Sequence, residues 1–372
     1  MSGIAPRIID LTLRDGEQAA GICFPRKRRI ELARLLFDVG VREIEAGMPA
    51  MGREAEEDFL AIAKALPDMR VIAWNRVRAG DIESSARAGA RTVHIALPAS
   101  DIMLGAKLGW GRERALGELG SVLLLCGRLG LEAIVGAEDA SRADPAFLLR
   151  VYATAVAGGA LRLRYADTLG AQDPFAVFDR MRYLSSIFDV PIEYHAHNDL
   201  GLATANALAA LRAGAMASVT VGGVGERAGN ASLEQVACAS ALLLGEDQGI
   251  DLGRLAELNY LASELSERAI PPDKPIVGSM AFSHESGIHV DALEKDPSTY
   301  EFLRPELVGR ERAVIPGRHS GKKALRHCAR TLGCEPDEAS LEKLGALVRE
   351  RWAEGAPTDP WGAFSALLRE VS

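Results

Sequence analysis

The sequence predicts an α/β fold: a closed (β/α)₈ barrel followed by a smaller, mostly helical C-terminal region. Eight short apolar runs recur at intervals of roughly 20 to 35 residues, and helix-like stretches lie between them. Small residues, glycine above all, end these helices just before the next strand. Eight strand–helix units in succession favour a parallel closed barrel. An open doubly wound sheet is the alternative, but it would place a glycine-rich nucleotide-binding turn after the first strand, and residues 13–17 (LRDGE) are not one.

The expected elements follow one another without a long gap. The expected strands cover residues 8–13, 43–47, 71–75, 92–97, 133–137, 161–166, 192–197 and 218–223. The expected helices between them cover residues 28–39, 54–65, 82–88, 114–129, 146–157, 174–188 and 202–213. This order is typical of a barrel in which each strand is followed by the helix that covers it.

The pattern changes after residue 253, where we place the end of the barrel. A helix at 254–268 leads into a turn-rich segment, PPDKP, at 271–275. Residues 254–322 are therefore interpreted as a linker and a subdomain rich in His, Ser and Gly. Two helical patterns, 323–332 and 339–354, indicate a C-terminal helical subdomain over 323–372.

Composition excludes several classes of protein. The net charge of −8 argues against general affinity for nucleic acid or for an anionic membrane. The five cysteines are scattered without CxxC spacing, as expected for reduced thiols. No apolar run approaches the ~20 residues of a membrane span, and no secretory leader is visible, so we expect a cytoplasmic protein.

The strongest candidate site lies on the seventh expected strand. His195 and His197 are two residues apart, so both side chains point to one face, at the C-terminal end of the barrel where active sites lie. Two imidazoles on one face suit a divalent metal. The alternative is a pair of ordinary polar histidines that hydrogen-bond to their neighbours.

The first expected strand ends in Arg14, Asp15 and Gly16. A solvated salt bridge is one interpretation of the Arg–Asp pair. At the barrel mouth, however, the carboxylate of Asp15 could complete a metal site with the histidines, and Arg14 could hold a carboxylate or a developing oxyanion.

Two further motifs could contribute. The segment GGVGERAGN at 222–230 follows the eighth expected strand, where barrels often bind phosphate, and Asn230 offers an amide oxygen as a further hard ligand. His289 ends the segment HESGIH beyond the barrel. It could serve as a general base, or it could belong to a zinc-binding or merely solvated loop.

Together these motifs resemble the family of homocitrate, isopropylmalate and citramalate synthases, also called the DRE-TIM metallolyases. The resemblance rests on LRDGEQ at 13–18, HAHND at 195–199, GERAGN at 225–230, SGIH at 286–289 and RHSGK at 318–322. Within the family, residues 44–52, 74–76, 136–142 and 164–170 resemble the homocitrate synthases of nitrogen fixation. Because few residues follow the last helical pattern, we expect no leucine-sensing domain of the kind typical of isopropylmalate synthases.

The resemblance implies a metal site and a set of roles. Asp15, His195 and His197 would bind one divalent metal ion (zinc, manganese, magnesium or iron), with Asn230 as a further ligand. Arg14 would stabilise the alkoxide formed at C2 of 2-oxoglutarate, while Gln18 and Thr168 would contact the substrate. His289, with Glu138 and Tyr300, would take a proton from acetyl-CoA. A homodimer is implied, in which the C-terminal region of one chain lies over the barrel of its partner.

This sequence departs from the lysine-pathway homocitrate synthases, which resemble it otherwise. They carry an Arg early in the fifth strand and a His at the end of the third, where this chain has Ile134 and Asn75-Arg76. Our hypothesis is that Arg76 or Arg164 holds the distal carboxylate of the substrate, unless Arg164 is structural. Alternatives are an isopropylmalate or citramalate synthase, a barrel lyase that cleaves a carbon–carbon bond, and a non-catalytic metal-binding homologue.

Overall fold

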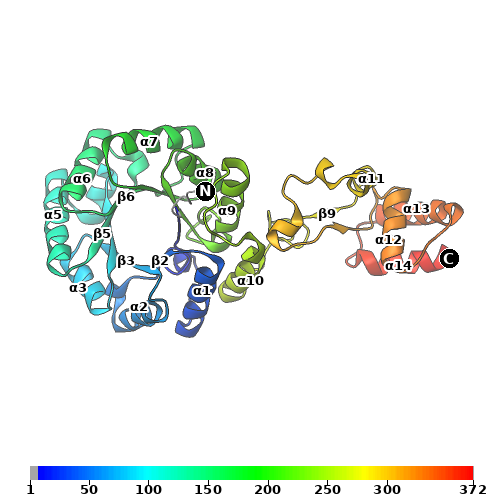
Figure 1. The fold of residues 1–372 in the computed structure, drawn as a ribbon, viewed down its shortest axis with the longest axis horizontal. Helices are drawn as coiled ribbons and strands as arrows, with labels where there is room; N and C mark the ends of the chain where they lie inside the picture. Colours follow the sequence, from blue (N-terminus) through cyan, green and yellow to red (C-terminus); the bar gives the residue numbers. More distant parts are fainter. Residues whose placement is uncertain (1–6, 372) are drawn as a thin grey trace. The chain divides into compact units, whose positions relative to one another are not determined.

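The computed structural model describes residues 7–371. The chain forms two compact units, and the boundary between them in the sequence falls between Ala269 and Ile270. Figure 1 shows the ring of strands and helices of the first unit and the small strand pair and helices of the second. Each unit is described by itself below.

The first unit is a closed barrel, as predicted. Eight parallel strands pair in sequence order, and β1 closes the ring by pairing with both β2 and β8, with Asp10 opposite Ile44 on one side and Val219 on the other. The strands are β1 Ile8–Asp10, β2 Glu43–Glu45, β3 Arg70–Arg76, β4 Thr92–Pro98, β5 Glu132–Glu138, β6 Arg162–Asp167, β7 Ile192–Ala196 and β8 Met216–Val219. Their carboxyl ends therefore meet at one mouth of the barrel.

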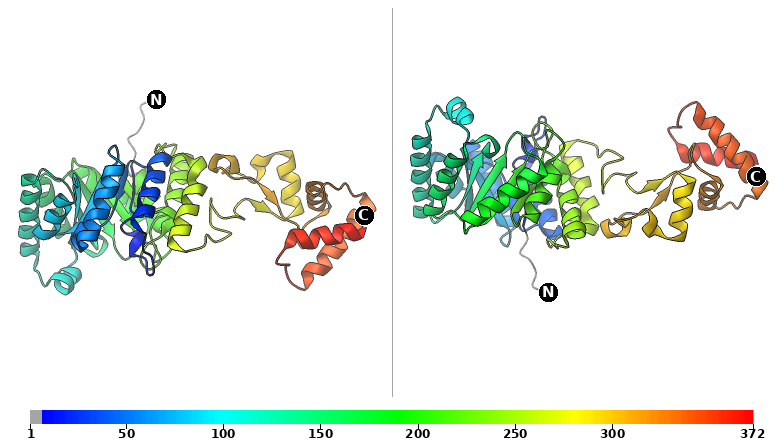
Figure 2. Two further views of the ribbon diagram at one scale, coloured as in Figure 1. Left: turned by 90° about the horizontal axis from the view of Figure 1, so that it is seen from below. Right: turned by 90° about the horizontal axis from the view of Figure 1, so that it is seen from above.

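Helices surround the strands in both side views (Figure 2). The larger ones are α1 Arg26–Val39, α2 Arg53–Ala65, α3 Ala79–Arg87, α5 Arg112–Arg128, α6 Pro145–Ala157, α7 Pro174–Ile187, α8 Ala203–Arg212, α9 Leu233–Ala239 and α10 Leu255–Ser266. Helix α1 ends at Gly40, whose φ of +114° is disfavoured for any residue with a side chain. A Cβ there would also lie 1.9 Å from the backbone oxygen of Gly249, so this position requires glycine.

Two strands at the closure of the barrel differ from the prediction. β1 was expected to run to residue 13 but ends at Asp10, because the carbonyl of Leu11 accepts hydrogen bonds from the amides of Arg14, Asp15 and Gly16 and turns the chain. β8 was expected at 218–223 but covers only Met216–Val219. The apolar runs indicated where these strands lie, but the turns after them depend on backbone hydrogen bonds.

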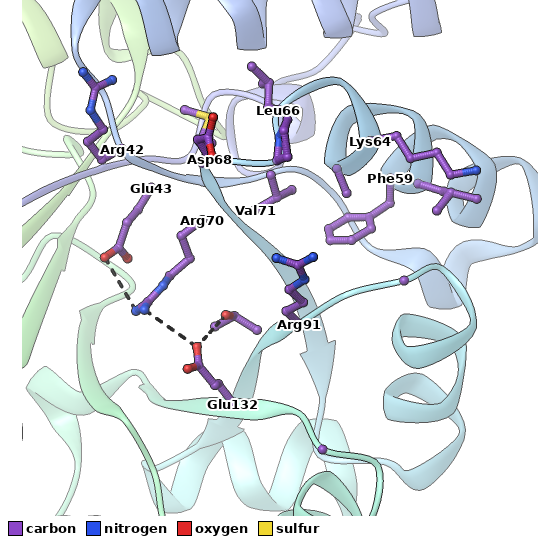
Figure 3. A pocket seen from close by; sticks show the side chains of 17 residues that line it. Arg42, Glu43, Phe59, Lys64, Leu66, Asp68, Arg70, Val71, Arg91 and Glu132 are labelled. Atoms are coloured by element: carbon purple, nitrogen blue, oxygen red, sulfur yellow. Dashed lines mark hydrogen bonds and ion pairs between the residues drawn. The ribbon is translucent and has the colours of Figure 1, made fainter.

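One cluster of buried side chains in the interior of the barrel forms an apolar layer. Ile9, Leu11, Ile72 and Ile134 are buried there, with Met216 packed against them. Outside this layer, at the amino ends of β2 to β5, lies a surface cavity of about 790 Å³. Figure 3 shows Arg70 of this cavity between Glu43 and Glu132, each 3.7 Å away. Such partly exposed pairs contribute little to stability.

The second unit contains a short parallel strand pair, β9 Ser283–His284 and β10 Ala313–Val314. Its helices are α11 Gly287–Lys295, α12 Lys322–Thr331, α13 Glu338–Ala353 and α14 Pro360–Val371. The sequence analysis missed α11 and α14. One hydrophobic core joins Val290 and Val314 with residues of all three C-terminal helices, so the segments separated at residue 322 share one unit.

The boundary of the barrel unit also differs from the one drawn at residue 253. Helix α10 belongs to the first unit, where Glu264 forms an ion pair of 2.7 Å with Arg28 of α1. The turn-rich segment around Pro271 begins the second unit. Among the helices of residues 7–371, none has the length and apolar character that crossing a membrane requires.

Candidate functional site

The turn after β1 fixes the first part of the site. Arg14 donates through Nε to Oε2 of Glu45 and through Nη1 to Oδ1 of Asp15, both at 2.6 Å. Arg29 of α1 also fixes this turn. Its Nη2 donates to the carbonyl of Leu13 at 3.1 Å and to that of Ala46 at 2.7 Å. The guanidinium of Arg14 and the carboxylate of Asp15 are therefore held in place by groups from β2 and α1.

Asp15, His195 and His197 converge at the mouth of the barrel. All three are buried, and one ligand atom from each lies within 4.8 Å of the others. Three buried atoms, Oδ2 of Asp15 and Nδ1 of each imidazole, have no hydrogen-bond partner within the described part of the chain. Oδ1 of Asn230 is unpaired in the same way, and its backbone bridges to that of His197. Unpaired nitrogen and oxygen donors gathered in one buried site fit a divalent cation.

The protonation states of these groups also suit metal binding. Burial alone would raise the pKa of Asp15, but its neighbours, Arg14 first among them, lower it to about 2. Burial, followed by the neighbouring His197, lowers the pKa of His195 well below its ordinary value. Burial lowers the pKa of His197 as well. The site therefore offers one carboxylate and two neutral imidazoles near neutral pH, which are the forms that coordinate metals.

Beneath this site lies a layer of buried charges. Arg164 is fully buried and pairs through Nη1 with Glu45 and through Nε with Glu193, both at 2.6 Å. Arg162 continues the layer toward the amino ends of the strands, with Nε 2.8 Å from Glu193. His94 lies beside it, with Nδ1 2.9 Å from Nη1 of Arg164. Because each arginine is compensated by a carboxylate, the layer can remain charged inside the barrel.

A cavity of about 270 Å³ opens beside the three candidate ligands. Its walls on β4, β5 and β6 include Ala96, Gly136 and Ala166, which lie two residues after His94, Ile134 and Arg164 and therefore on the same inward face. Small side chains at three neighbouring inward positions leave this space open. The lining also includes Arg14, Asp15, Gln18, Trp74, His94, Lys107, Glu138, Arg164, Thr168, His195, His197, Glu226 and Arg227.

Comparisons with known proteins identify the family. Residues 5–261 match the HMGL-like family, and residues 276–355 match the family described as homocitrate synthase post-HMGL domain-like. Homocitrate synthase 1 of Nostoc sp. is 44% identical over 92% of each chain. The chain belongs to the family of homocitrate, isopropylmalate and citramalate synthases.

Two further matches define how far the likeness extends. The 2-isopropylmalate synthase 2 of Caldanaerobacter subterraneus is 43% identical, over 86% of this chain and 83% of its own length. An HMG-CoA lyase from Brucella melitensis has the same barrel, with a TM-score of 0.62 over 71% of this chain and 99% of its own, at 21% identity. Two relatives with different names thus match equally well, and the lyase supports the fold alone.

The structure brings most of the predicted residues of this synthase family member to one cavity. Gln18 lies 3.4 Å from Nη1 of Arg14. Thr168 accepts a hydrogen bond of 2.8 Å from the amide of Asp139, and Glu138 lines the cavity beside it. Each follows or ends a barrel strand, as sites at the carboxyl mouth do.

Arg76 is placed elsewhere. It forms two hydrogen bonds with Asp81 of α3, at 2.8 and 2.9 Å, and about half of its side chain is exposed. It is not among the residues that line the cavity. Of the two arginines proposed for the distal carboxylate, only Arg164 is within the cavity wall.

His289 and Tyr300 lie together in the second unit. Their rings are 4.2 Å apart, and His289 belongs to helix α11 and not to the loop that the sequence suggested as an alternative. His284 faces His289 edge-on at 6.4 Å, and its pKa is lowered by burial. Two of the three groups implied in proton abstraction are therefore held as a local pair.

Sequence reasoning missed several lining residues. Trp74 lies under Arg14, whose guanidinium carbon is 5.8 Å from the ring centre. Lys107 comes from a π-helical turn after β4 and pairs with Glu138 at 2.6 Å. His94 lies on β4, two residues before Ala96. The alternation of the predicted strand 92–97 would have placed His94 and Ala96 on one face, which was the available signal.

Proposed function

We propose that this protein condenses acetyl-CoA with 2-oxoglutarate and hydrolyses the thioester to give homocitrate and CoA, with one divalent metal ion. The observation that carries the proposal is the set of unpaired buried ligand atoms on Asp15, His195 and His197, next to Arg14 and a cavity of about 270 Å³. The 44% identity to a homocitrate synthase over 92% of the chain supports the choice of product.

A divalent ion bound by these ligands, with Asn230, would polarise the 2-oxo group of the acid as a Lewis acid. The chain's own residues then have distinct tasks. Arg14, held by Glu45 and Asp15, is positioned to stabilise negative charge that forms on the substrate oxygen. Thr168 and Gln18 offer a hydroxyl and an amide to bind and orient the acid.

The acetyl methyl group is a weak carbon acid, so its proton must pass to a positioned base. We assign this proton to His289, next to Tyr300, with Glu138 in the barrel cavity as the third group. His289 and Tyr300 belong to the second unit and Glu138 to the first. We propose a homodimer in which the second unit of one chain supplies His289 to the barrel of the other.

The distal carboxylate of 2-oxoglutarate needs a positive partner, and Arg164 in the cavity wall supports that assignment. Nη2 of Arg164 has no hydrogen-bond partner among the residues described, although Glu45 and Glu193 compensate its charge. Arg76 is a weaker candidate because Asp81 already binds it on both sides.

The second candidate function is the same condensation with another 2-oxo acid, as in isopropylmalate or citramalate synthesis. It is favoured by the 43% identity to a 2-isopropylmalate synthase and by the small residues Ala96, Gly136 and Ala166, which would also leave room for an alkyl tail. A non-catalytic homologue would be expected to have lost an active group, and Arg14, Asp15, His195, His197 and His289 are all present.

The test is release of free thiol from acetyl-CoA with a panel of 2-oxo acids, with and without chelator. Release with 2-oxoglutarate in preference to 2-oxoisovalerate and pyruvate, abolished by chelator and restored by metal, is the expected result. Preference for 2-oxoisovalerate or pyruvate would replace homocitrate synthesis with the second candidate. No release with any acid would refute both.

The motifs shared with nitrogen-fixation enzymes suggest that the product serves nitrogenase cofactor synthesis. In a nitrogen-fixing host, loss of this gene should then prevent growth on dinitrogen, and added homocitrate should restore it. Growth on dinitrogen without the gene would contradict this role.

A further inference from the structure

A surface cavity at the amino end of the barrel serves none of the roles assigned above. Its volume is about 790 Å³, and small-molecule sites typically measure about 300–1,000 Å³. It lies between the first residues of β2 to β5 and the end of helix α2, and it shares no lining residue with the cavity at the mouth. Two arginines from neighbouring strands line it: Arg70 begins β3, and Arg91 immediately precedes β4.

Neither of these guanidinium groups makes a hydrogen bond within residues 7–371. Arg70 lies 3.7 Å from one oxygen each of Glu43 and Glu132, which is longer than a hydrogen bond. The side chain of Arg91 has no ion pair among the same residues, and Figure 3 shows dashed lines at Arg70 but none at Arg91. Each guanidinium carries N–H donors in a planar fork, so two neighbouring groups offer an anion a set of unused donors.

The two carboxylates near Arg70 are already bound by other groups. Oε2 of Glu43 accepts a hydrogen bond from Nη2 of Arg162 at 2.9 Å, and Arg162 is buried in the charged layer of the barrel. Oε2 of Glu132 accepts from Oγ1 of Thr92 at 3.0 Å. Glu43 therefore stays with Arg162, and Arg70 can bind an incoming anion without the loss of a short ion pair.

The lining indicates the chemistry of the ligand. Cationic side chains outnumber acidic ones in it, although the whole chain carries a net charge of −8. The cationic residues are Arg42, Lys64, Arg70 and Arg91, and the acidic residues are Glu43, Asp68 and Glu132. Buried apolar side chains form the wall beside them, namely Phe59, Leu66 and Val71. Unused guanidinium donors next to an apolar wall suit a ligand with an anionic head and a hydrocarbon body.

We propose that this cavity binds a small organic acid whose carboxylate accepts hydrogen bonds from Arg70 and Arg91. Its hydrocarbon body packs against the apolar wall. A carboxylate matches the planar fork of a guanidinium group. A bare inorganic anion would leave the apolar wall without a partner, and an uncharged molecule would leave both guanidinium groups without one. The cavity is separate from the candidate metal site, so the proposal stands independently of the condensation.

The probe for the test is 4-methylpentanoate, which has a carboxylate on a branched hydrocarbon chain and lacks a 2-oxo group. Its affinity for the full chain is measured by NMR titration of its methyl signals, with a chelator present so that no metal-dependent binding contributes. Inorganic phosphate supplies the anion without the hydrocarbon, and 4-methylpentan-1-ol supplies the hydrocarbon without the anion. The variants are Arg91→Ala, Arg70→Ala and the double variant. Arg212→Ala, at an exposed residue of α8 outside the lining, is the control.

We expect a dissociation constant on the order of 1 mM for 4-methylpentanoate with the wild type and with the control. Each single variant should bind the acid about 10-fold more weakly, as loss of one hydrogen bond to a charged group predicts, and the double variant should show no binding. Phosphate and the alcohol should each bind at least about 10-fold more weakly than the acid.

Full affinity in the double variant would overturn the proposal, and so would a wild-type chain that does not bind the acid. Phosphate that binds as tightly as the acid and competes with it would overturn the choice of an organic acid. Melting temperatures establish that each variant is folded. If Arg70→Ala does not fold, Arg91→Ala decides, because the side chain of Arg91 is exposed and makes no hydrogen bond or ion pair within residues 7–371. Unchanged affinity in that variant then refutes the assignment.

Discussion

Removing the charge of Glu45 should destabilise the barrel more than any comparable surface change. Glu45 is fully buried and compensates two arginines at once, Arg14 and Arg164, each at 2.6 Å. Burial alone would raise the pKa of Glu45, but these two cations lower it well below its ordinary value. The variant Glu45→Gln keeps the shape of the side chain and leaves both guanidinium groups without their shared anion.

Breaking one buried ion pair by removing a partner costs about 3–5 kcal/mol, so we expect at least this loss of barrel stability. The matched control is Glu132→Gln, whose side chain is 51% exposed and 3.7 Å from Arg70; it should cost about 0–1 kcal/mol. Amide hydrogen exchange of peptides from strands β1 to β8 measures the free energy of opening the barrel in the full chain. Equal losses for the two variants would refute the interpretation of the layer as a set of charged pairs.

Three further predictions follow from the same structure. Zn²⁺ or Mn²⁺ at 100 times its dissociation constant should raise the free energy of unfolding by about 2.7 kcal/mol, which thermal melting measures as a higher melting temperature. The melting temperature of a His195→Ala, His197→Ala double variant should not rise when the metal is added. Since the pKa of His94 is about 4 in the folded chain against an ordinary 6.5, its contribution to stability is complete above pH 6.5 and is lost as the pH falls through 4. Between pH 7 and pH 4, the free energy of unfolding measured by denaturant should fall by about 3 kcal/mol more in the wild type than in His94→Gln. Parallel curves of unfolding free energy against pH for the two proteins would contradict this. Gly40→Ala should destabilise the barrel strongly, because of its φ of +114° and a backbone clash, whereas Gly130→Ala, with φ +68° and no atom within 4 Å, should cost about 1–2 kcal/mol in thermal unfolding.

Much of the barrel could be predicted from the sequence because its signals are local. Apolar runs, helix caps and glycines follow from the conformational preferences of neighbouring residues, and they indicated all eight strands. The alternation of a strand placed His195 and His197 on one face without knowledge of any other strand. Helices α11 and α14 were missed because α11 lies in a segment rich in His, Ser and Gly, and α14 begins at a proline, Pro360.

The contents of the site depended on the tertiary structure. The alternation of side chains along a strand predicts which residues point inward. The pairing of β1 with β8 closes the barrel and so decides which inward residues of different strands lie close together. That pairing brings Asp15 next to His195, and the barrel places Arg164 between Glu45 and Glu193. It also left Nε2 of His94, which no motif marked, without a hydrogen-bond partner among the described residues.

The sequence by itself therefore determined the fold class, the candidate pair of metal ligands on β7 and the family. The structure decided that Arg76 binds Asp81 and that Arg164 lies in the cavity wall. The physical reason is the range of the interactions. Strand and helix formation depends on residues a few positions apart, whereas a buried charge is stable only where closure of the barrel brings an opposite charge from a distant strand.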